Sequence, residues 1–353
     1  MPERAATTYG ISVLGSTLAA TARLAAEADH AGLDATWTSE FYTRSGVVSL
    51  AAMAAATERC RLGSSILYGI GRTPLVLAGE ARDLDELSGG RLVLGLGNGT
   101  RTMIRDWHGQ DPDAPALRME ELVPLLRRVW RLHEGPVEHD GRFYHLRLVP
   151  TGPVPEPLRE RIPVIIAGVR PRMIEAAGRV ADGLACHPLL TVRYAEEVAR
   201  PALQRGAQHA GRDVAELEMV GMVICSLHPD GEQARREAAA QIAFYSSVKT
   251  YDKLLEVSGF SAEAEAIREA FGRRDLPAMF AAVTDEMIDA IAVTGSSAQA
   301  IRDGLRRYEG VLDHVILYSP SIVSSPERVE ENIASLIDAC APLAQVPAGG
   351  VGG

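Results

Sequence analysis

The chain predicts a (β/α)₈ barrel with insertions. Short apolar runs alternate with helical patterns over nearly all of its 353 residues, and eight such runs can be counted. Small or polar residues follow the strands repeatedly, as at the active end of a barrel. The nearest alternative is an open, doubly wound sheet. Its glycine-rich fingerprint follows the first strand, whereas the step 97–99 follows the fourth, so the barrel is favoured.

The first four strand–helix units each combine a short apolar run with helix start or stop signals. Gly32 ends the first helix, and Pro74 opens the third. The fourth helix carries leucine and valine along one side, as an amphipathic helix should. The strands are predicted at residues 9–13, 35–38, 61–67 and 91–96, and the helices at 17–31, 48–57, 74–87 and 118–133.

The segment 161–188 contains the most informative unit. A buried-strand run ends at Gly168, and Pro171 stands where the next helix begins. A helix start beside a strand end presents backbone N–H groups and a positive dipole end, which bind phosphate or another anion. The remaining strands are predicted at residues 164–167, 184–186, 218–226 and 314–318, with helices at 172–181 and 325–341.

Two insertions interrupt the alternation within one domain, residues 1–345. Residues 137–144 predict a hairpin that turns at Asp140-Gly141, inside an insertion over 135–160. A helix-rich stretch over about 231–291, between strands seven and eight, is long for one crossover. The tail 346–353 has the composition of a frayed end.

Composition narrows the class of protein. A formal net charge of −10 argues against general affinity for nucleic acid or an anionic membrane surface. No apolar run reaches the length of a membrane span, and the start MPERAATTYG lacks a signal-peptide core, so we expect a cytoplasmic protein. The four cysteines are far apart and no tight His/Asp/Glu cluster occurs, which predicts neither disulfides nor a metal site.

The candidate site residues follow predicted strand ends, which meet at one face of a barrel. Glu40 is a general acid or a member of a structural ion pair. His187 orients or protonates a substrate, or is a turn residue, and Tyr68 is a proton donor or a packing residue. The other candidates, for cofactor binding, are Ser39, Ser65, Ile66, Gly97, Asn98, Gly99, Gly168, Val169 and Arg170.

Several of these runs resemble the luciferase-like flavin and deazaflavin oxidoreductases. The resemblance extends from about Tyr9 to Tyr318, and its combined pattern is specific although each piece is weak. Gly97-Asn98-Gly99-Thr100-Arg101, Asp106-Trp107-His108-Gly109 and His187-Pro188 are similar to the branch that uses coenzyme F420. The runs that carry the family resemblance are 28–40, 59–66, 72–74, 83–97 and 176–183.

The resemblance implies roles for individual residues. Ser39 and Glu40 would line the ring pocket, and a non-proline cis peptide would join Ser65 to Ile66. The remaining implied contacts are Gly97 and Asn98 near the cofactor, and Gly168 and Val169 with N–H groups toward its phosphate. Arg170 departs from the small residue common in relatives, and it either pairs with the anionic tail or points into solvent.

The resemblance implies an F420-dependent oxidoreductase. It would transfer hydride between the deazaflavin C5 and an activated C=C, C=N or C=O bond of a small or medium-sized organic substrate. The alternative is an FMN-dependent monooxygenase fed by a separate reductase, and a third interpretation is a non-catalytic barrel that only binds a ligand. The helices 48–57 and 74–87 are candidates for a homodimer face.

Overall fold

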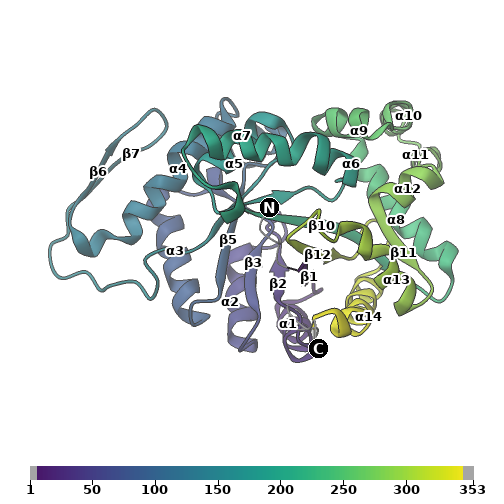
Figure 1. Cartoon of the computed structure of the whole chain (residues 1–353), viewed down its shortest axis with the longest axis horizontal. Coiled ribbons are helices and arrows are strands. Elements are labelled where there is room, and N and C mark those ends of the chain that lie inside the picture. Colours follow the sequence, from purple (N-terminus) through teal and green to yellow (C-terminus); the bar gives the residue numbers. More distant parts are fainter. Residues whose placement is uncertain (1–5, 345–353) are drawn as a thin grey trace, which may run out of the picture. The chain divides into compact units, whose positions relative to one another are not determined.

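The protein is a (β/α)₈ barrel, as the sequence predicts (Figure 1). The structure, a computed structural model, describes residues 6–344. The strands are β1 Thr8–Ser12, β2 Ala35–Thr38, β3 Arg61–Ser64, β4 Leu67–Tyr68, β5 Leu92–Gly97, β6 Val137–Asp140, β7 His145–Leu148, β8 Val164–Ala167, β9 Gly183–Cys186, β10 Glu218–Leu227, β11 Ala292–Gly295 and β12 His314–Tyr318.

The helices cover most of the remaining chain. They are α1 Leu18–Ala31, α2 Gly46–Ala56, α3 Pro74–Leu87, α4 Pro115–Trp130, α5 Pro171–Val180, α6 Val192–Tyr194, α7 Arg200–His209, α8 Gly231–Ser246, α9 Asp252–Ser258, α10 Ser261–Gly272, α11 Leu276–Ala281, α12 Asp285–Ile291, α13 Ala298–Leu305 and α14 Pro326–Ala344. Among residues 6–344, no helix is both long and apolar enough to cross a membrane.

The main sheet is parallel in its recorded pairings and closes on itself. Its order is β11-β10-β12-β1-β2-β3-β5-β8-β9, and β10 also pairs with β9. β4 pairs with β5 just beyond the end of β3, and β11 pairs with β10 as an extra strand. The helical stretch predicted between strands seven and eight contains α8 to α12.

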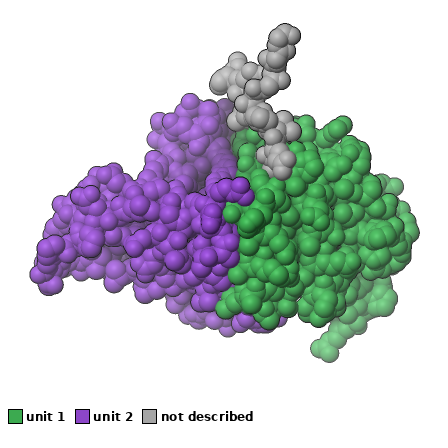
Figure 2. Space-filling view, turned by 90° about the horizontal axis from the view of Figure 1, so that it is seen from below, with its two compact units in different colours: residues 1–36, 186–201, 219–353 green, residues 37–185, 202–218 purple. Residues whose placement is uncertain are grey.

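The described residues form two compact units (Figure 2). Unit 1 consists of residues 6–36, 186–201 and 219–344, and unit 2 of residues 37–185 and 202–218. Unit 1 has its own core, which includes Ile11 and Val315, both fully buried. Unit 2 likewise buries Leu94 and Ile166 completely. The single-domain boundaries stay a prediction, and the tail 346–353 lies outside the described residues.

Helix ends follow the capping signals in the sequence. The Thr17 side chain accepts a hydrogen bond from the Ala20 N–H at the start of α1, and Gly32 ends that helix in the left-handed region with φ 88°. The Thr73 side chain caps α3 through the Val76 N–H, with Pro74 at the first helical position. These caps satisfy backbone groups that the helices leave unpaired at their ends.

Three strand segments differ from the predicted ones, and α4 begins and ends three residues before the predicted helix 118–133. The predicted strand 61–67 is divided into β3 and β4, and the Ser65–Ile66 peptide between them is cis, as the family resemblance implies. The hairpin has a wider loop than an Asp-Gly turn, because the Glu121 carboxylate accepts the Phe143 and Tyr144 N–H groups. β11 was not expected, because its four residues carry no recognisable alternation.

The helices α5 and α7 approach each other closely through two glycines of unit 2. A Cβ atom on Gly178 would lie 2.3 Å from the Leu203 carbonyl oxygen, and one on Gly206 would lie 2.1 Å from the Glu175 carbonyl oxygen. These neighbours are backbone atoms, which cannot rotate away. The helix spacing therefore requires glycine at both positions.

Substituting Gly206→Ala should lower stability by about 2 kcal/mol, because the added methyl group must push the two helices apart. Gly79→Ala is the matched control, since its Cβ would meet nothing within 4 Å on α3. That change should stabilise the protein by about 0.5 kcal/mol through helix propensity. Thermal unfolding of both variants tests this, and equal shifts would contradict the close packing.

Candidate active site

The carboxyl ends of β2 and β3 meet in unit 2 around the Ser65–Ile66 peptide. The Ser65 N–H donates to the Thr38 carbonyl at 2.8 Å, and the Glu40 N–H donates to the Ile66 carbonyl at 3.0 Å. The Ser39 hydroxyl donates to the Ser65 carbonyl at 2.7 Å. The structure therefore brings these predicted site residues together, and their backbone positions are fixed by one another.

The end of β5 packs against the same peptide. Gly97 touches the Ile66 side chain so closely that a Cβ there would lie 2.3 Å from the Ile66 Cδ1. Asn98 is buried, and its Nδ2 donates to the Pro115 carbonyl at 3.1 Å. Its Oδ1 is buried with no hydrogen-bond partner within the described residues. A buried carbonyl oxygen of this kind is costly unless a ligand or water satisfies it.

Gly99 lies beside the Tyr68 ring. Its φ of +71° lies in the left-handed region, which glycine adopts more readily than other residues. A Cβ on Gly99 would lie 3.0 Å from the Tyr68 Cε1. The His108 ring also contacts Tyr68, with ring centroids 4.9 Å apart. Tyr68 is 5% exposed, so its ring is held by its neighbours on the wall of the site.

Glu40 is paired with Arg72 through two hydrogen bonds of 2.7 and 2.6 Å. Its carboxylate also accepts the Tyr68 N–H at 3.0 Å, and the Arg72 Nε donates to Glu80 at 2.7 Å. Burial, the largest single effect, raises the pKa of Glu40, but the Arg72 and backbone hydrogen bonds together hold that pKa below its usual value. Glu40 is therefore a fixed negative charge and holds no proton to donate at neutral pH.

A cavity of about 640 Å³ lies over this ion pair within unit 2. That volume is typical of sites for small molecules. Its wall includes Glu40, Tyr68, Arg72, Trp107 and His108. The Nε2 atom of His108 is buried without a hydrogen-bond partner in the part of the chain that the structure describes. A π-helical turn, Met103–Trp107, precedes His108, and such turns are frequent at functional sites.

The predicted anion site lies where β8 meets α5. Gly168 permits the end of β8 to lie close to the first turns of α5, since a Cβ on Gly168 would lie 3.2 Å from the Ile174 backbone nitrogen. One expectation is wrong here: the Gly168 N–H already donates to the Ala185 carbonyl at 3.2 Å, because the strand ladder continues through it. Val169 and Arg170 follow directly, and Arg170 is the N-cap residue of α5.

In unit 1, His187 lies among tyrosines at the end of β9. Its ring stacks on Tyr251 with centroids 3.9 Å apart and meets Tyr245 edge-on at 4.7 Å. The Leu189 N–H donates to its Nδ1 at 3.2 Å, so the neutral ring carries its proton on Nε2. Burial lowers the pKa of His187 to about 3. The ring is therefore neutral at physiological pH, and its Nε2–H is a hydrogen-bond donor.

The same part of unit 1 holds a pair of buried hydroxyl groups. The Tyr245 and Tyr318 hydroxyl oxygens are 3.1 Å apart. Burial is the main cause that raises the pKa of Tyr245 well above its usual value, and it raises the pKa of Tyr251 to about 12. Both tyrosines therefore keep their protons throughout the physiological range.

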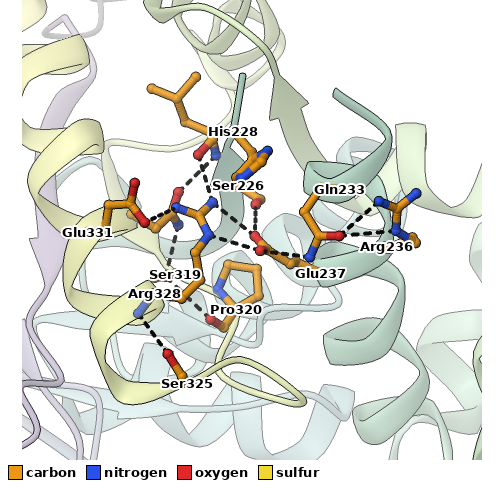
Figure 3. Close-up of polar contacts among 12 residues, drawn as sticks. Ser226, His228, Gln233, Arg236, Glu237, Ser319, Pro320, Ser325, Arg328 and Glu331 are labelled. Atoms are coloured by element: carbon orange, nitrogen blue, oxygen red, sulfur yellow. Dashed lines mark hydrogen bonds and ion pairs between the residues drawn. The ribbon is translucent and has the colours of Figure 1, made fainter. Parts of the chain in front are cut away.

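A second cavity, of about 430 Å³, lies in unit 1 and is lined by an ion pair whose charged groups all have hydrogen-bond partners (Figure 3). Arg328 on α14 faces Glu237 on α8, with hydrogen bonds of 2.9 and 3.1 Å. Burial, the largest effect, raises the pKa of Glu237, but hydrogen bonds from Arg328, Ser226 and Gln233 outweigh it and lower that pKa. Since the carboxylate and the guanidinium already have partners, this network joins the end of β10 to two helices.

The predicted residues thus fall in two groups. Ser39, Glu40, Ser65, Ile66, Tyr68, Gly97, Asn98, Gly99, Gly168, Val169 and Arg170 belong to unit 2, and His187 belongs to unit 1. Sequence reasoning missed Arg72 and His108 as site residues. The available signal for Arg72 was its place in the short segment between a predicted strand end and the Thr73-Pro74 helix start. Among residues 6–344, no group of three or more His, Cys, Asp or Glu side chains could hold a metal ion.

Removing the Arg72 guanidinium should be costly, because it leaves the Glu40 carboxylate part-buried and without its cation. Arg72→Ala should lower stability by about 3 kcal/mol and raise the pKa of Glu40. Arg105→Ala is the control, because its ion pair with Asp106 is exposed. Chemical denaturation distinguishes them. Similar denaturation midpoints for both variants would show that the Glu40–Arg72 pair does not stabilise the loops that follow β2 and β4.

Protonation of His187 should couple folding to pH. Since the folded pKa is about 3 and an unfolded histidine titrates near 6.5, the unfolded chain binds the extra proton between these values. Stability should therefore fall as pH falls through this window, by up to about 1.4 kcal/mol per pH unit more than in His187→Gln. Denaturation series from pH 7 to 4 measure the difference, and parallel curves would contradict a neutral His187.

Comparison with known proteins agrees with the barrel. The sequence model of the family described as luciferase-like monooxygenase matches residues 3–314. An uncharacterized protein of Mycobacterium tuberculosis is 34% identical over 306 residues, covering 85% of this chain and 89% of its own length. A second protein of that organism, named as a putative coenzyme F420-dependent oxidoreductase, is 28% identical, covering 78% of this chain and 83% of its own.

Three further comparisons concern one named reductase and two solved structures. The 5,10-methylenetetrahydromethanopterin reductase of Methanopyrus kandleri is 29% identical, covering 78% of this chain and 81% of its own. The structure titled as the coenzyme F420-dependent tetrahydromethanopterin reductase of that organism has a TM-score of 0.77 at 24% identity, covering 95% and 99%. A Pseudomonas putida Baeyer–Villiger monooxygenase component in complex with FMN has 0.67 at 14%, covering 97% and 100%. The match over residues 3–314 means that this chain belongs to the luciferase-like monooxygenase family.

Proposed function

We propose that this protein is an F420-dependent oxidoreductase. Its reaction is hydride transfer between the deazaflavin C5 and an activated C=C, C=N or C=O bond of a small or medium-sized organic substrate. The observation that carries the proposal is the convergence of Ser39, Glu40 and Gly97 on the Ser65–Ile66 peptide. Two relatives support it: one is named as a putative coenzyme F420-dependent oxidoreductase, and the other is named as a 5,10-methylenetetrahydromethanopterin reductase.

The residues present fit such a cofactor. The unpartnered Oδ1 of Asn98 offers a buried hydrogen-bond acceptor. The preceding residue, Gly97, has no side chain where its backbone packs against Ile66. Ser39, Ser65, Ile66, Gly97, Asn98 and Gly99 would hold the ring. Val169, Arg170 and the first turn of α5 would hold the anionic tail, which the positive end of the helix dipole favours.

When bound, F420 supplies a ring carbon that carries hydride. The chain's own residues supply position and charge. Glu40 acts as a fixed carboxylate that holds the Tyr68 backbone and Arg72 in place. We assign hydrogen-bond donation toward the reacting group to the Tyr68 hydroxyl, which lies in the same unit as the residues that would hold the ring. His187 stays a candidate donor of unit 1, since its Nε2–H is neutral. Glu40 is not the proton donor in this scheme, because its ion pair keeps it ionised.

The second candidate is an FMN-dependent monooxygenase that works with a separate flavin reductase. The family description as a luciferase-like monooxygenase favours it. A flavin ring would use the same strand ends as a deazaflavin ring. The two candidates differ in whether reduced cofactor reacts with oxygen or passes hydride directly to an organic acceptor.

Assembly as a homodimer is part of the proposal. Val48 on α2 and Leu75 and Val76 on α3 are 49%, 46% and 49% exposed. These two helices pack against each other within unit 2, and their exposed apolar side chains would be covered in a dimer.

Cofactor binding tests the proposed function directly. Titration of the purified protein with F420 should give saturable quenching of F420 fluorescence, while FMN should bind weakly. Arg170→Glu should weaken F420 binding about tenfold, since it reverses a charge near the anionic tail. Arg193→Glu, an exposed arginine of unit 1, is the control. Tight FMN binding without an F420 response would favour the monooxygenase.

A further inference from the structure

Three exposed aromatic rings gather at the cavity over the Glu40–Arg72 pair. Phe41 and Tyr42 follow β2, and Trp107 ends the π-helical turn. The Phe41 and Tyr42 ring centroids are 4.3 Å apart, and Trp107 meets both edge-on at 5.2 and 5.3 Å. We name these three residues the aromatic mouth. All three line the cavity of about 640 Å³.

The exposure of the aromatic mouth is unusual for this chain. Phe41, Tyr42 and Trp107 are 42%, 73% and 41% exposed. Among residues 6–344, only two other aromatic side chains, Phe244 and Phe271, are exposed. Exposed apolar surface costs free energy in water, so its concentration on the wall of one cavity indicates a ligand.

The cavity changes in character with depth. Its buried residues are polar: the Glu40 and Arg72 side chains are 11% and 15% exposed, and Tyr68 is 5% exposed. The unpartnered Nε2 of His108 belongs to the same wall. Aromatic rings prefer offset or edge-on contact with another flat ring. Flat apolar contact at the rim and hydrogen-bonding groups beneath it therefore suit a planar molecule with a polar end.

We propose that the aromatic mouth is the specificity determinant of this enzyme and binds the flat ring of a conjugated carbonyl compound. The carbonyl end faces the polar residues beneath it. The proposal rests on the proposed function only in calling this ligand the substrate. The ring of the cofactor has the same flat chemistry, but the residues assigned to it, Ser39, Gly97 and Asn98, are better buried than the mouth. The substrate is therefore the occupant we assign to the exposed rings.

The chain carries its own reporter for this test. Of its three tryptophans, Trp37 and Trp130 are fully buried, and Trp107 is exposed. The probe is 1,4-naphthoquinone, a planar conjugated dicarbonyl compound. 2-Decalone is the matched control, since it has two fused six-membered rings and a carbonyl but is neither flat nor conjugated. All four cysteines are buried, which limits addition of the quinone to thiols.

Calorimetric titration of the protein without cofactor should show saturable binding of 1,4-naphthoquinone, with quenching of Trp107 emission, and much weaker binding of 2-decalone. Tyr42→Leu and Trp107→Leu each keep an apolar side chain but remove a ring. Each should weaken naphthoquinone binding about three- to tenfold. Phe271→Leu, at the exposed ring on α10, should leave binding unchanged.

Several outcomes would overturn the proposal. Equal binding of 2-decalone would show a merely apolar cavity, and full affinity in both Leu variants would show that the mouth makes no contact with the ligand. If the Leu variants lost F420 affinity and kept naphthoquinone affinity, the mouth would hold the cofactor ring. Failure of the wild-type protein to bind F420 would instead contradict the proposed function and leave the naphthoquinone result standing.

Discussion

The carboxylate of Glu40 is the contact on which the candidate site depends. It follows β2, accepts the backbone N–H of Tyr68 in β4, and pairs with Arg72 just before α3. One side chain therefore joins the loops that follow two neighbouring strands. Because Arg72 also binds Glu80 on α3, the loop geometry is tied to a helix. Glu40, a candidate for acid catalysis, is held in an ion pair, and the role we propose for it is to position these loops.

The buried groups of the two units, each taken by itself, differ in electrical character. In unit 2 the cavity contains a permanent ion pair, whose charges are stabilised by each other and by backbone hydrogen bonds. In unit 1, His187 and its tyrosine neighbours are neutral, because burial disfavours their charged forms. The proposed hydride transfer needs fixed fields and hydrogen-bond donors more than it needs titrating groups near neutral pH.

Much of the fold could be predicted from local signals. The strands Ala35–Thr38, Val164–Ala167 and His314–Tyr318 and the helix Pro74–Leu87 have the predicted bounds, because each is a continuous apolar run or carries its own cap. The break between β3 and β4 could not be derived from composition, since 61–67 reads as one strand; only the family resemblance indicated it. The strand ends that form the site were identified because barrel strands share one functional face.

The chemistry of the site was harder to predict than its location. Glu40 and Arg72 are 32 residues apart, and no local pattern shows that they pair. The tautomer of His187 follows from the Leu189 N–H, and its ring contacts Tyr245 and Tyr251, which lie far along the chain in a helical insertion. The Gly168 N–H was assigned to a phosphate, but the strand ladder already uses it. Strand register and long-range contacts decide such details, and periodicity does not encode them.

The contact between α5 and α7 has a consequence for ancestry. Gly178 and Gly206 each face backbone oxygen of the opposite helix, so neither position can acquire a side chain while the other helix stays where it is. A lineage that enlarged one residue would have to shift α5, and with it the first turn proposed to hold the anionic tail. Descendants that bind the same tail are therefore constrained at two positions that never touch it. Glycine at both positions would mark relatives whose α5 is placed in the same way for binding the tail, even where the residues around the cofactor ring have diverged.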